Sequence, residues 1–347
     1  MLAYRLLEWQ QPPELVEVPV PAAGPGEVLV EVAGCGLCHS DLTMVAIPSE
    51  FGAALGWRVP FTLGHETAGR VAQLGEGVTG VVAGDAVALT SPSSCGHCPT
   101  CLAGRESACP SGDAGRGYGR DGGLAGYVVA PMREVLPLGP LDPRSAGPLT
   151  DAGATSHHAV RRARPELGEG STAVVIGVGG LGWFTVQILK ATTPARIVAV
   201  DIDPARRAIA TELGADAVVD GGSGQELREA LAALAGGAQG GVDAVIDIVG
   251  TDATIAAGLG ALRRGGAFVL VGSGGGGFPR PWFGGLPREA TITAVQGSSI
   301  DDARQVIALA ADGRVKVEVD EYPLERVADA YAALDAGTLR GRALVVP

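Results

Sequence analysis

The 347-residue sequence has no cluster of basic residues, and its only lysines are Lys190 and Lys316. With a formal net charge of -12, it offers no surface that would neutralise the phosphates of DNA or RNA, which argues against a nucleic-acid partner. The N-terminus has an early glutamate and no basic start, so it does not resemble a signal peptide. No run reaches the roughly 18 uninterrupted apolar residues of a membrane-spanning helix. We therefore expect a cytoplasmic protein without a membrane partner.

Composition and length together predict a two-domain globular protein. Apolar residues make up 46% of the sequence and charged residues 18%, and the 54 glycines suit many tight turns. A chain of 347 residues is about twice as long as a typical domain. In a reducing cytoplasm, the six cysteines are expected to be metal ligands or free thiols instead of disulfides.

The character of the sequence changes near residue 150. Up to about residue 148 it is rich in proline and glycine and predicts short strands, as in EVLVEVAG and LAGYVVAP. From about residue 170, apolar strands alternate with alanine-rich helical stretches, and the last 50 residues become β-rich again. We predict a β-rich domain formed by residues 1–149 and 298–347, interrupted by a second domain of residues 150–297.

The inserted segment predicts a doubly wound α/β domain. Near-continuous runs of Val, Ile and Ala, joined through helices, indicate a parallel sheet covered on both faces. Six such strands complete a dinucleotide-binding unit. The strands are expected at 172–177, 196–201, 216–220, 242–250, 265–272 and 291–297, and helices at 180–192, 204–213, 225–235, 252–264 and 301–312.

A glycine motif directly follows the first of these strands. Gly177, Gly179 and Gly182 occur in VVIGVGGLG, at the start of the expected helix. Such glycines permit a tight turn, close approach of a pyrophosphate and packing of the helix on the sheet. The free N–H groups at the helix N-terminus favour phosphate. We expect a dinucleotide site that also includes Gly180 and Leu181; the alternative is a glycine-rich turn without a ligand.

Asp201 ends the second expected strand, 19 residues after Gly182. A carboxylate at this position accepts hydrogen bonds from the ribose hydroxyls and repels the 2′-phosphate of NADP, so NAD is the expected cofactor. Arg206 is near enough in sequence to soften that preference. The alternative role for such a carboxylate is a helix cap, which Asp203 before Pro204 fits better.

Four cysteines are concentrated in the segment CGHCPTCLAGRESAC. Four thiolates in one loop can close a tetrahedral site without an open position, which is typical of structural zinc. The alternatives are an iron–sulfur cluster, whose bacterial spacing differs at the fourth cysteine, and a zinc ribbon that binds nucleic acid, which the acidity disfavours. The expected structural zinc ligands are Cys95, Cys98, Cys101 and Cys109.

The segment GCGLCHSDLT contains the other two cysteines, Cys35 and Cys38. A catalytic zinc usually takes three protein ligands and leaves a fourth position open. Further candidate ligands are His65 and Glu66 in GHETAG, and Asp151 in TDAGATSHHAV. We predict that Cys38, His65 and Asp151 hold a second zinc, with Glu66 as either a transient fourth ligand or a group that orients the site.

Together these motifs resemble the zinc-dependent medium-chain alcohol dehydrogenases over the whole chain. CHSD, GHETAGRVAQLGEGV, the four-cysteine segment, GVGGLG and GTLRGRALVVP occur in the order of that family. The resemblance implies a GroES-like catalytic domain and a Rossmann domain with a six-stranded parallel sheet, the active site lying in the cleft between them. It also implies NAD, two zinc ions per chain, one catalytic and one structural, and a homodimer or homotetramer.

The resemblance assigns roles to individual residues. Cys38, His65 and Asp151 become ligands of the catalytic zinc, with aspartate where many members have cysteine, as in a bacterial and archaeal subset. Ser40 matches the hydroxyl that touches the substrate oxygen. The expected cofactor contacts outside the glycine motif are Thr155, Val249, Val271, Gly272 and Arg340.

One departure from the family concerns the proton relay. Many members end it at a histidine where this chain has Thr43, so the proton would leave through Thr43, water or the cofactor ribose. His39 is either a member of the relay, a contact of the cofactor phosphate, or a structural histidine. Trp57 and Gln296 are expected in the substrate pocket, although a single aromatic residue is as often part of a core.

The expected reaction is the reversible oxidation of secondary or medium-chain alcohols to ketones or aldehydes, by hydride transfer from a zinc-bound alkoxide to NAD. Because Gln296 is polar, a polyol or sugar-alcohol dehydrogenase of the same superfamily is an alternative. A third candidate is a non-catalytic NAD and zinc sensor in which Cys35 and Cys38 form a switching dithiol. Otherwise Cys35 is expected to be a small buried residue, and Asp41 to brace the turn at Cys38.

Overall fold

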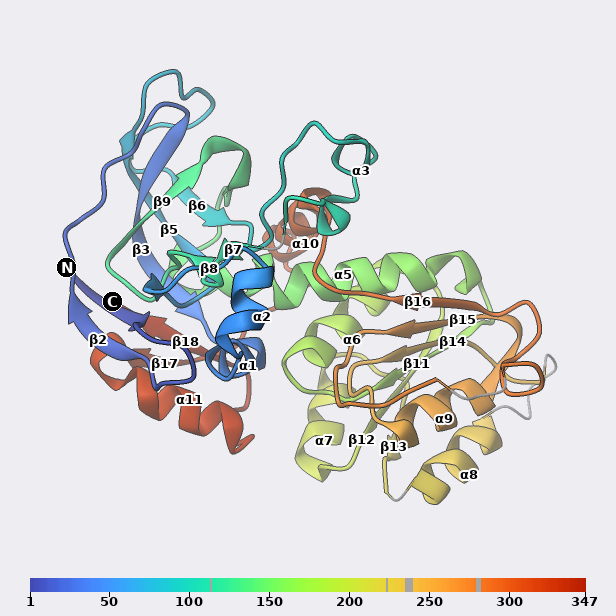
Figure 1. The fold of residues 1–347 in the computed structure, drawn as a ribbon. Helices are drawn as coiled ribbons and strands as arrows, with labels where there is room; N and C mark the ends of the chain where they lie inside the picture. Colours follow the sequence, from blue (N-terminus) through green and yellow to red (C-terminus); the bar gives the residue numbers. More distant parts are fainter. Residues whose placement is uncertain (113, 223, 235–239, 279–281) are drawn as a thin grey trace. The chain divides into compact units, whose positions relative to one another are not determined.

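The computed structural model describes residues 1–112, 114–222, 224–234, 240–278 and 282–347 (Figure 1). This part of the chain forms two compact units. Unit 1 consists of Met1–Ala154 and Gly297–Pro347, and unit 2 of Thr155–Gln296. The predicted domain boundary after residue 149 lies five residues before the end of the first part of unit 1, and the boundary after residue 297 lies one residue beyond the end of unit 2.

Unit 1 is built around a seven-stranded sheet with the order β10-β6-β5-β3-β18-β17, in which β9 also pairs with β3. Strands β3 and β18 come from opposite ends of the chain, and Val345 pairs antiparallel with Cys35. The C-terminal segment therefore completes a sheet that begins near the N-terminus. The strands are β3 (Glu27–Gly36), β5 (Glu66–Leu74), β6 (Ala86–Leu89), β9 (Tyr127–Pro131), β10 (Val135–Pro137), β17 (Val319–Pro323) and β18 (Arg342–Val346).

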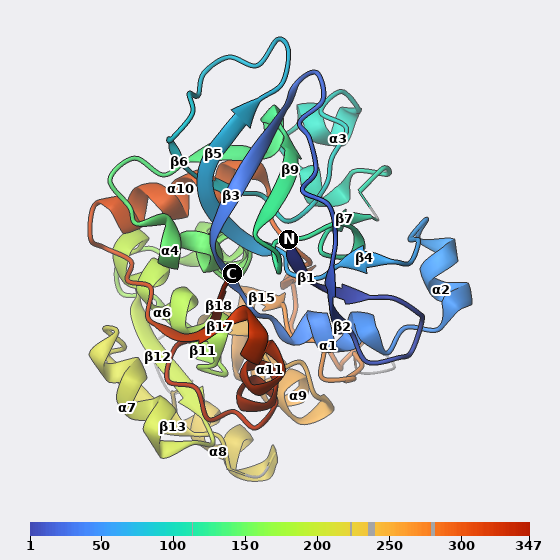
Figure 2. The same cartoon turned by 90° about the vertical axis from the view of Figure 1, so that its left-hand side faces the viewer.

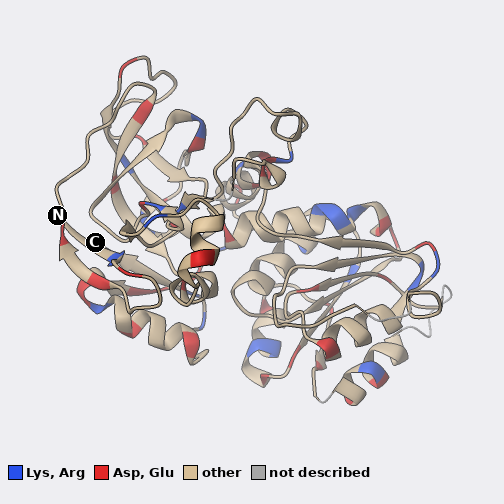
Figure 3. Ribbon diagram, in the orientation of Figure 1, with Lys and Arg blue, Asp and Glu red and all other residues tan. Residues whose placement is uncertain are grey.

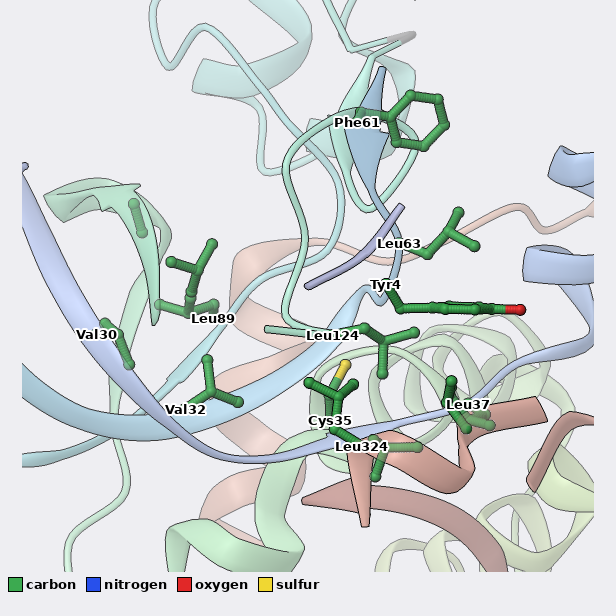
Figure 4. Close-up of a cluster of buried hydrophobic side chains, with 14 of the residues drawn as sticks. Tyr4, Val30, Val32, Cys35, Leu37, Phe61, Leu63, Leu89, Leu124 and Leu324 are labelled. Carbon is green, nitrogen blue, oxygen red and sulfur yellow. The ribbon is translucent and has the colours of Figure 1, made fainter. Parts of the chain in front are cut away.

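Apolar side chains on the inner face of this sheet form the core of unit 1 (Figure 4). Alternation of inward and outward side chains along the strands directs residues such as Val30 and Val32 into the cluster. Helix α11 (Val327–Asp335) contributes Val327, Ala330, Tyr331 and Leu334 to it, and Figures 1 and 2 show this helix beside β17 and β18. The core thus fixes the ends of β3 and β5, where the candidate metal ligands lie.

Shorter elements complete unit 1. A three-stranded sheet has the order β2-β1-β4, and β7 pairs with β8. The strands are β1 (Leu2–Leu6), β2 (Glu14–Glu17), β4 (Phe61–Thr62), β7 (Gly115–Arg116) and β8 (Gly119–Arg120), and the helices, besides α11, are α1 (His39–Val45), α2 (Ser49–Ala54), α3 (Pro99–Leu102), α4 (Pro143–Ala146) and α10 (Ile300–Ala311).

Unit 2 contains the predicted six-stranded parallel sheet, with the order β13-β12-β11-β14-β15-β16. All six residues of β14 are buried, as expected for a strand with both faces of its sheet covered. Helices α8 and α9 lie together on one face (Figure 1). The strands are β11 (Thr172–Ile176), β12 (Arg196–Asp201), β13 (Ala217–Asp220), β14 (Val242–Asp247), β15 (Leu262–Leu270) and β16 (Thr291–Ala294), and the helices are α5 (Ala152–Ala163), which begins in unit 1, α6 (Gly180–Thr192), α7 (Pro204–Glu212), α8 (Gly224–Leu234) and α9 (Asp252–Ala261).

One helix is shorter than its sequence pattern predicts. The apolar pattern suggests a helix over 252–264, but α9 ends at Ala261, and β15 begins at Leu262. Leu262 is buried and pairs with Val242 of β14, so strand pairing overrides the local helical pattern at this point. Residue 235, the expected end of the helix over 225–235, lies outside the described residues.

The surface of the described chain is acidic and mixed in sign. Asp and Glu number 38 in the sequence against 26 Lys and Arg, and Figure 3 shows the two signs interspersed along both units. Within the ranges that the structure covers, no helix is both long enough and apolar enough to cross a membrane.

Candidate functional site

The first candidate metal ligand, Cys38, caps helix α1. It lies two residues after the end of β3 and has extended backbone angles, as an N-cap residue requires. Oδ2 of Asp41 accepts the backbone N–H of Cys38 at 3.0 Å, so Asp41 does brace this turn. Cys38 therefore has a fixed position at the N-terminus of α1.

His65 is positioned by a tight turn before β5. Gly64 has φ of +95°, and a side chain there would meet Sγ of Cys35 at 2.7 Å, so the turn requires glycine. Nδ1 of His65 lies 2.9 Å from Oδ1 of Asp41. A carboxylate at this distance favours a proton on Nδ1, which leaves Nε2, the atom nearer to Ser40 and Asp151, as the candidate metal-binding atom. Asp41 thus orients two candidate ligands at once.

Asp151 completes a group of three donor side chains. It lies between the 3-10 helix η3 (Gly147–Thr150) and α5, and its Oδ2 is 3.4 Å from Nε2 of His65. The donor atoms of Cys38, His65 and Asp151 all lie within 4.8 Å of one another. In a tetrahedral zinc site with bonds of about 2.1 Å, nitrogen and oxygen ligands are about 3.4 Å apart. The three side chains therefore fit zinc with one position left open.

Charges at this group depend on one another. Burial alone would lower the pKa of His65, but Asp41 and Asp151 raise that pKa well above its ordinary value. Burial would raise the pKa of Asp151, but the neighbouring His65 brings it below the ordinary value. A proton on the imidazole of His65 thus balances the negative charge of the neighbouring carboxylates. A metal cation bound to the group would replace that proton.

Glu66 pairs with an arginine and is not one of the three donor residues. It is completely buried and forms an ion pair with Arg342, the first residue of β18. Burial raises its pKa to about 7, in spite of the lowering effect of Arg342. Among the described residues, the cluster of mutually close donor atoms contains Cys38, His65 and Asp151 but not Glu66. This geometry suits the orienting role better than that of a ligand.

The predicted proton relay begins within reach of the donor group. Oγ of Ser40 lies 3.3 Å from Nε2 of His65, and Ser40 is exposed. The hydroxyl of Thr43 donates to the backbone carbonyl of His39 at 3.4 Å, so it bonds the preceding turn of its own helix. His39 and Thr43 are both exposed on α1. Ser40 therefore contacts the donor group through His65.

Sequence reasoning missed Tyr118, an aromatic neighbour of His65. The ring of Tyr118 stands edge-on to His65, with centroids 5.9 Å apart. Trp57, predicted in the substrate pocket, is buried and lies one ring farther away, 5.9 Å from Tyr118. Tyr118 occurs in an unremarkable GYG segment, so only the contact itself reveals it. Gln296, the other predicted pocket residue, is an exposed residue of unit 2.

The four-cysteine segment forms a compact loop around α3. Sγ of Cys95 is 3.9 Å from Sγ of Cys101, and Sγ of Cys98 is 3.9 Å from Sγ of Cys109. Zinc–sulfur bonds of about 2.3 Å place tetrahedral sulfur atoms about 3.8 Å apart, which matches both distances. Hydrogen bonds from Thr100 and the Cys101 backbone lower the pKa of Cys98 to about 6. The segment fits a closed structural zinc site.

The glycine motif has the predicted turn between β11 and α6. Gly177 has φ of +91°, and a side chain at Gly182 would meet the carbonyl oxygen of Gly177 at 2.0 Å. Asp201, at the end of β12, accepts the backbone N–H of Val178 at 2.7 Å and that of Asp203 at 2.9 Å. Asp201 therefore holds the motif loop through its two carboxylate oxygens.

The remaining predicted cofactor residues lie on several elements of unit 2, except for Arg340, which belongs to unit 1. Val249 follows β14, the neighbour of β11, and Val271 and Gly272 follow β15, the next strand in the sheet. Arg206 approaches the motif, since a side chain at Gly179 would meet its Nη1 at 2.8 Å. Gly180 and Leu181 begin α6, Thr155 is buried in α5, and Arg340 belongs to unit 1, where it pairs with Glu318.

Comparison with known proteins agrees with both units. Residues 24–140 match the model of the alcohol dehydrogenase GroES-like domain, and residues 180–312 match that of the zinc-binding dehydrogenase domain. An NAD-dependent alcohol dehydrogenase of Sulfurisphaera tokodaii is 34% identical, with complete coverage of both chains. A D-arabinose 1-dehydrogenase (NADP(+)) of Saccharolobus solfataricus is 31% identical, with 99% of this chain and 96% of that protein covered.

A solved structure extends the agreement to the fold. The alcohol dehydrogenase of the archaeon Aeropyrum pernix superposes with a TM-score of 0.90 at 33% identity, and all of both chains is covered. The predicted GroES-like and Rossmann architecture is thereby confirmed. Together with the two metal-binding groups and the glycine motif, these similarities show that the chain belongs to the zinc-binding alcohol dehydrogenase family of medium-chain dehydrogenases.

Proposed function

We propose that the protein is a zinc- and NAD-dependent alcohol dehydrogenase that interconverts alcohols with ketones or aldehydes. The observation that carries this proposal is the group of three donor atoms from Cys38, His65 and Asp151, within 4.8 Å of one another. The hydroxyl of Ser40 stands 3.3 Å from Nε2 of His65, so a proton acceptor adjoins the position that an alcohol oxygen would take.

Each residue of the group has a separate task. When bound, zinc would make an alcohol oxygen more acidic, and NAD would accept the hydride. Asp41 holds Nδ1 of His65 and the backbone of Cys38, which keeps both donor atoms directed to one point. Ser40 takes the proton from the alcohol oxygen and, because it is exposed, passes it to water. This exit does not need Thr43, whose hydroxyl is engaged with its own helix.

The class of alcohol is open between two candidates. Secondary or medium-chain alcohols follow from the aspartate in the donor group and from the similarity to alcohol dehydrogenases. A polyol or sugar substrate is supported by the similarity to the D-arabinose dehydrogenase. A redox sensor with a Cys35 and Cys38 dithiol is disfavoured, since Cys35 is completely buried among apolar side chains and burial raises its pKa to about 12 (Figure 4).

We also propose a homo-oligomer in a cytoplasmic location. Strand β16 is an edge of the unit 2 sheet, contains no charged residue, and follows two highly exposed aromatic residues, Trp282 (71% exposed) and Phe283 (78%). Unprotected edges of this kind pair readily with a second strand, here that of another copy.

The proposed cytoplasmic location is supported by the cysteines. All six are free of disulfides, which suits a reducing compartment.

The function and the donor assignment are tested together with the variant Asp151→Ala. We expect the wild-type protein to form NADH with propan-2-ol or with one member of a panel of alcohols and sugars. Asp151→Ala should lose the catalytic zinc and more than about 99% of turnover, because two ligands leave zinc weakly held, while NADH binding persists. The control is Asp335→Ala, which removes an exposed carboxylate of unit 1. Full zinc content with normal turnover in Asp151→Ala would refute the assignment.

The two classes of cysteine are distinguished by zinc content. We expect Cys98→Ser to lower zinc from about two ions per chain to about one and to reduce the melting temperature, since a closed four-sulfur site needs all its ligands. Cys35→Ala should keep both ions, because Cys35 belongs to the apolar core. Metal analysis and thermal unfolding check both outcomes. Loss of zinc from Cys35→Ala, or reversible oxidation of Cys35 with Cys38, would favour the sensor.

Asp201→Asn tests the cofactor preference without collapsing the loop. The amide oxygen still accepts the N–H of Val178, whereas the bond from the N–H of Asp203 is lost, and the side chain lacks the charge that repels a 2′-phosphate. We expect the ratio of kcat/KM for NADP to that for NAD to rise by about tenfold or more. Asp220→Asn, at the same end of neighbouring strand β13, should leave the ratio unchanged. An equal ratio in the Asp201 variant and the wild-type protein would contradict the role of its charge.

Phe283→Asp tests the proposed oligomer. Light scattering of the wild-type protein should give at least twice the chain mass of 34.9 kDa. The charged substitution should shift the protein towards monomer by weakening the apolar contact beside β16. Phe51→Asp, a change at an aromatic residue of unit 1 that is 56% exposed, should leave the mass unchanged. A wild-type monomer, or an equal shift in both variants, would overturn this interface.

A further inference from the structure

Asp247 is a completely buried carboxylate at the centre of the unit 2 sheet. It ends β14, where Ile176 of β11 lies beside it on one side and Leu270 of β15 on the other. In the sheet order β13-β12-β11-β14-β15-β16, strands β12 and β13 are added on one side of β11 and strands β14, β15 and β16 on the other, so the order of strands reverses between β11 and β14. Ligands of doubly wound sheets bind beyond the carboxyl ends of the strands at this reversal. Asp247 therefore lies directly beneath the expected dinucleotide.

The side chain of Asp247 fixes the loop after its own strand. Oδ1 accepts the backbone N–H of Val249 and that of Gly250, each at 2.9 Å. This arrangement is a local turn closed by an aspartate side chain. The turn determines the position of Val249. The side chain of Val249 packs against Gly177 of the glycine motif so closely that a Cβ atom at Gly177 would lie 2.8 Å from it.

The backbone of Asp247 fixes a second loop. Its carbonyl oxygen accepts the N–H of Val271 at 2.9 Å and that of Gly272 at 3.0 Å. The two loops then bind each other, because Gly274 donates to the carbonyl of Val249 at 3.0 Å. They also pack without space for a side chain, since a Cβ atom on Gly272 would lie 2.3 Å from the carbonyl carbon of Val249.

The negative charge of Asp247 is not what these bonds require. Burial raises the pKa of its carboxyl group, and the N–H of Gly250, the side chain of Thr254 and the N–H of Val249 only partly oppose this rise. Its second oxygen, Oδ2, is buried and has no hydrogen-bond partner among the described residues. An uncharged side chain with an oxygen at the position of Oδ1 would hold the same two N–H groups.

We propose that Asp247 is a positioning residue for the dinucleotide, which acts by holding the loops of Val249 and Gly272 against the glycine motif. The inference rests on the proposed use of NAD. In this proposal, the single residue Asp247 determines how three loops are arranged towards the cofactor: the glycine motif, the loop of Val249 and the loop of Gly272. Asp247 itself is completely buried, so the proposed role is to hold the loops and does not require contact with the ligand.

The test compares NADH dissociation constants, measured by fluorescence titration, for three variants and the wild-type protein. Asp247→Ala frees two N–H groups and should raise the dissociation constant about tenfold, or about 1.4 kcal/mol. Asp247→Asn keeps the acceptor and should restore binding to within about threefold of the wild-type value. The matched control is Asp243→Ala, at the opposite end of β14, where Asp243 pairs with Arg263 and accepts the N–H of Thr172.

The control separates positioning from general stability. Asp243→Ala should lower the melting temperature but leave the NADH dissociation constant within about twofold, because distant sites act independently. The inference fails if Asp247→Ala binds NADH as the wild-type protein does, or if Asp243→Ala weakens binding equally. Failure of the wild-type protein itself to bind NADH would instead overturn the proposed function. Should Asp247→Ala not fold, Asp247→Ser serves, since its shorter side chain cannot reach both N–H groups.

Discussion

The buried ion pair between Glu66 and Arg342 is the constraint on which the rest of unit 1 depends. Both side chains are almost completely removed from water, so neither charge can be left without the other. Glu66 begins β5 directly after His65, and Arg342 begins β18, so the pair joins the donor group to the C-terminal strand. Side chains at Gly36 or Gly147 would collide with Glu66, which makes this environment rigid.

Rigidity around Glu66 explains how three donors from distant segments meet. Cys38 caps a helix, His65 follows a glycine turn, and Asp151 ends a 3-10 helix, so no two share an element. The geometry of such a ligand group is set by the packing of the surrounding elements, because no single local segment holds two of the ligands. Asp41 adds the last constraint, because its two oxygens face Cys38 and His65 separately.

The sequence predicts those features that depend on local spacing. Cysteines a few residues apart, glycines after an apolar strand and six alternating strands all leave a pattern in one short segment. The contact of Glu66 with Arg342 spans 276 residues and leaves no such pattern. The same holds for Tyr118, whose approach to His65 comes from tertiary packing. Leu262 shows the opposite error, since a helical pattern there gives way to pairing with β14.

The insertion of unit 2 into unit 1 has a consequence for the order of events during synthesis. Unit 2 is continuous in sequence, so its sheet can close as soon as residue 296 has been made. Strand β3 must wait for β18, because Leu344 pairs with Gly36 across 308 residues (344 minus 36). Until then the edge of β3 at Cys35 and Gly36 lacks this partner. The nascent chain would therefore complete its nucleotide-binding half first and its metal-binding half last.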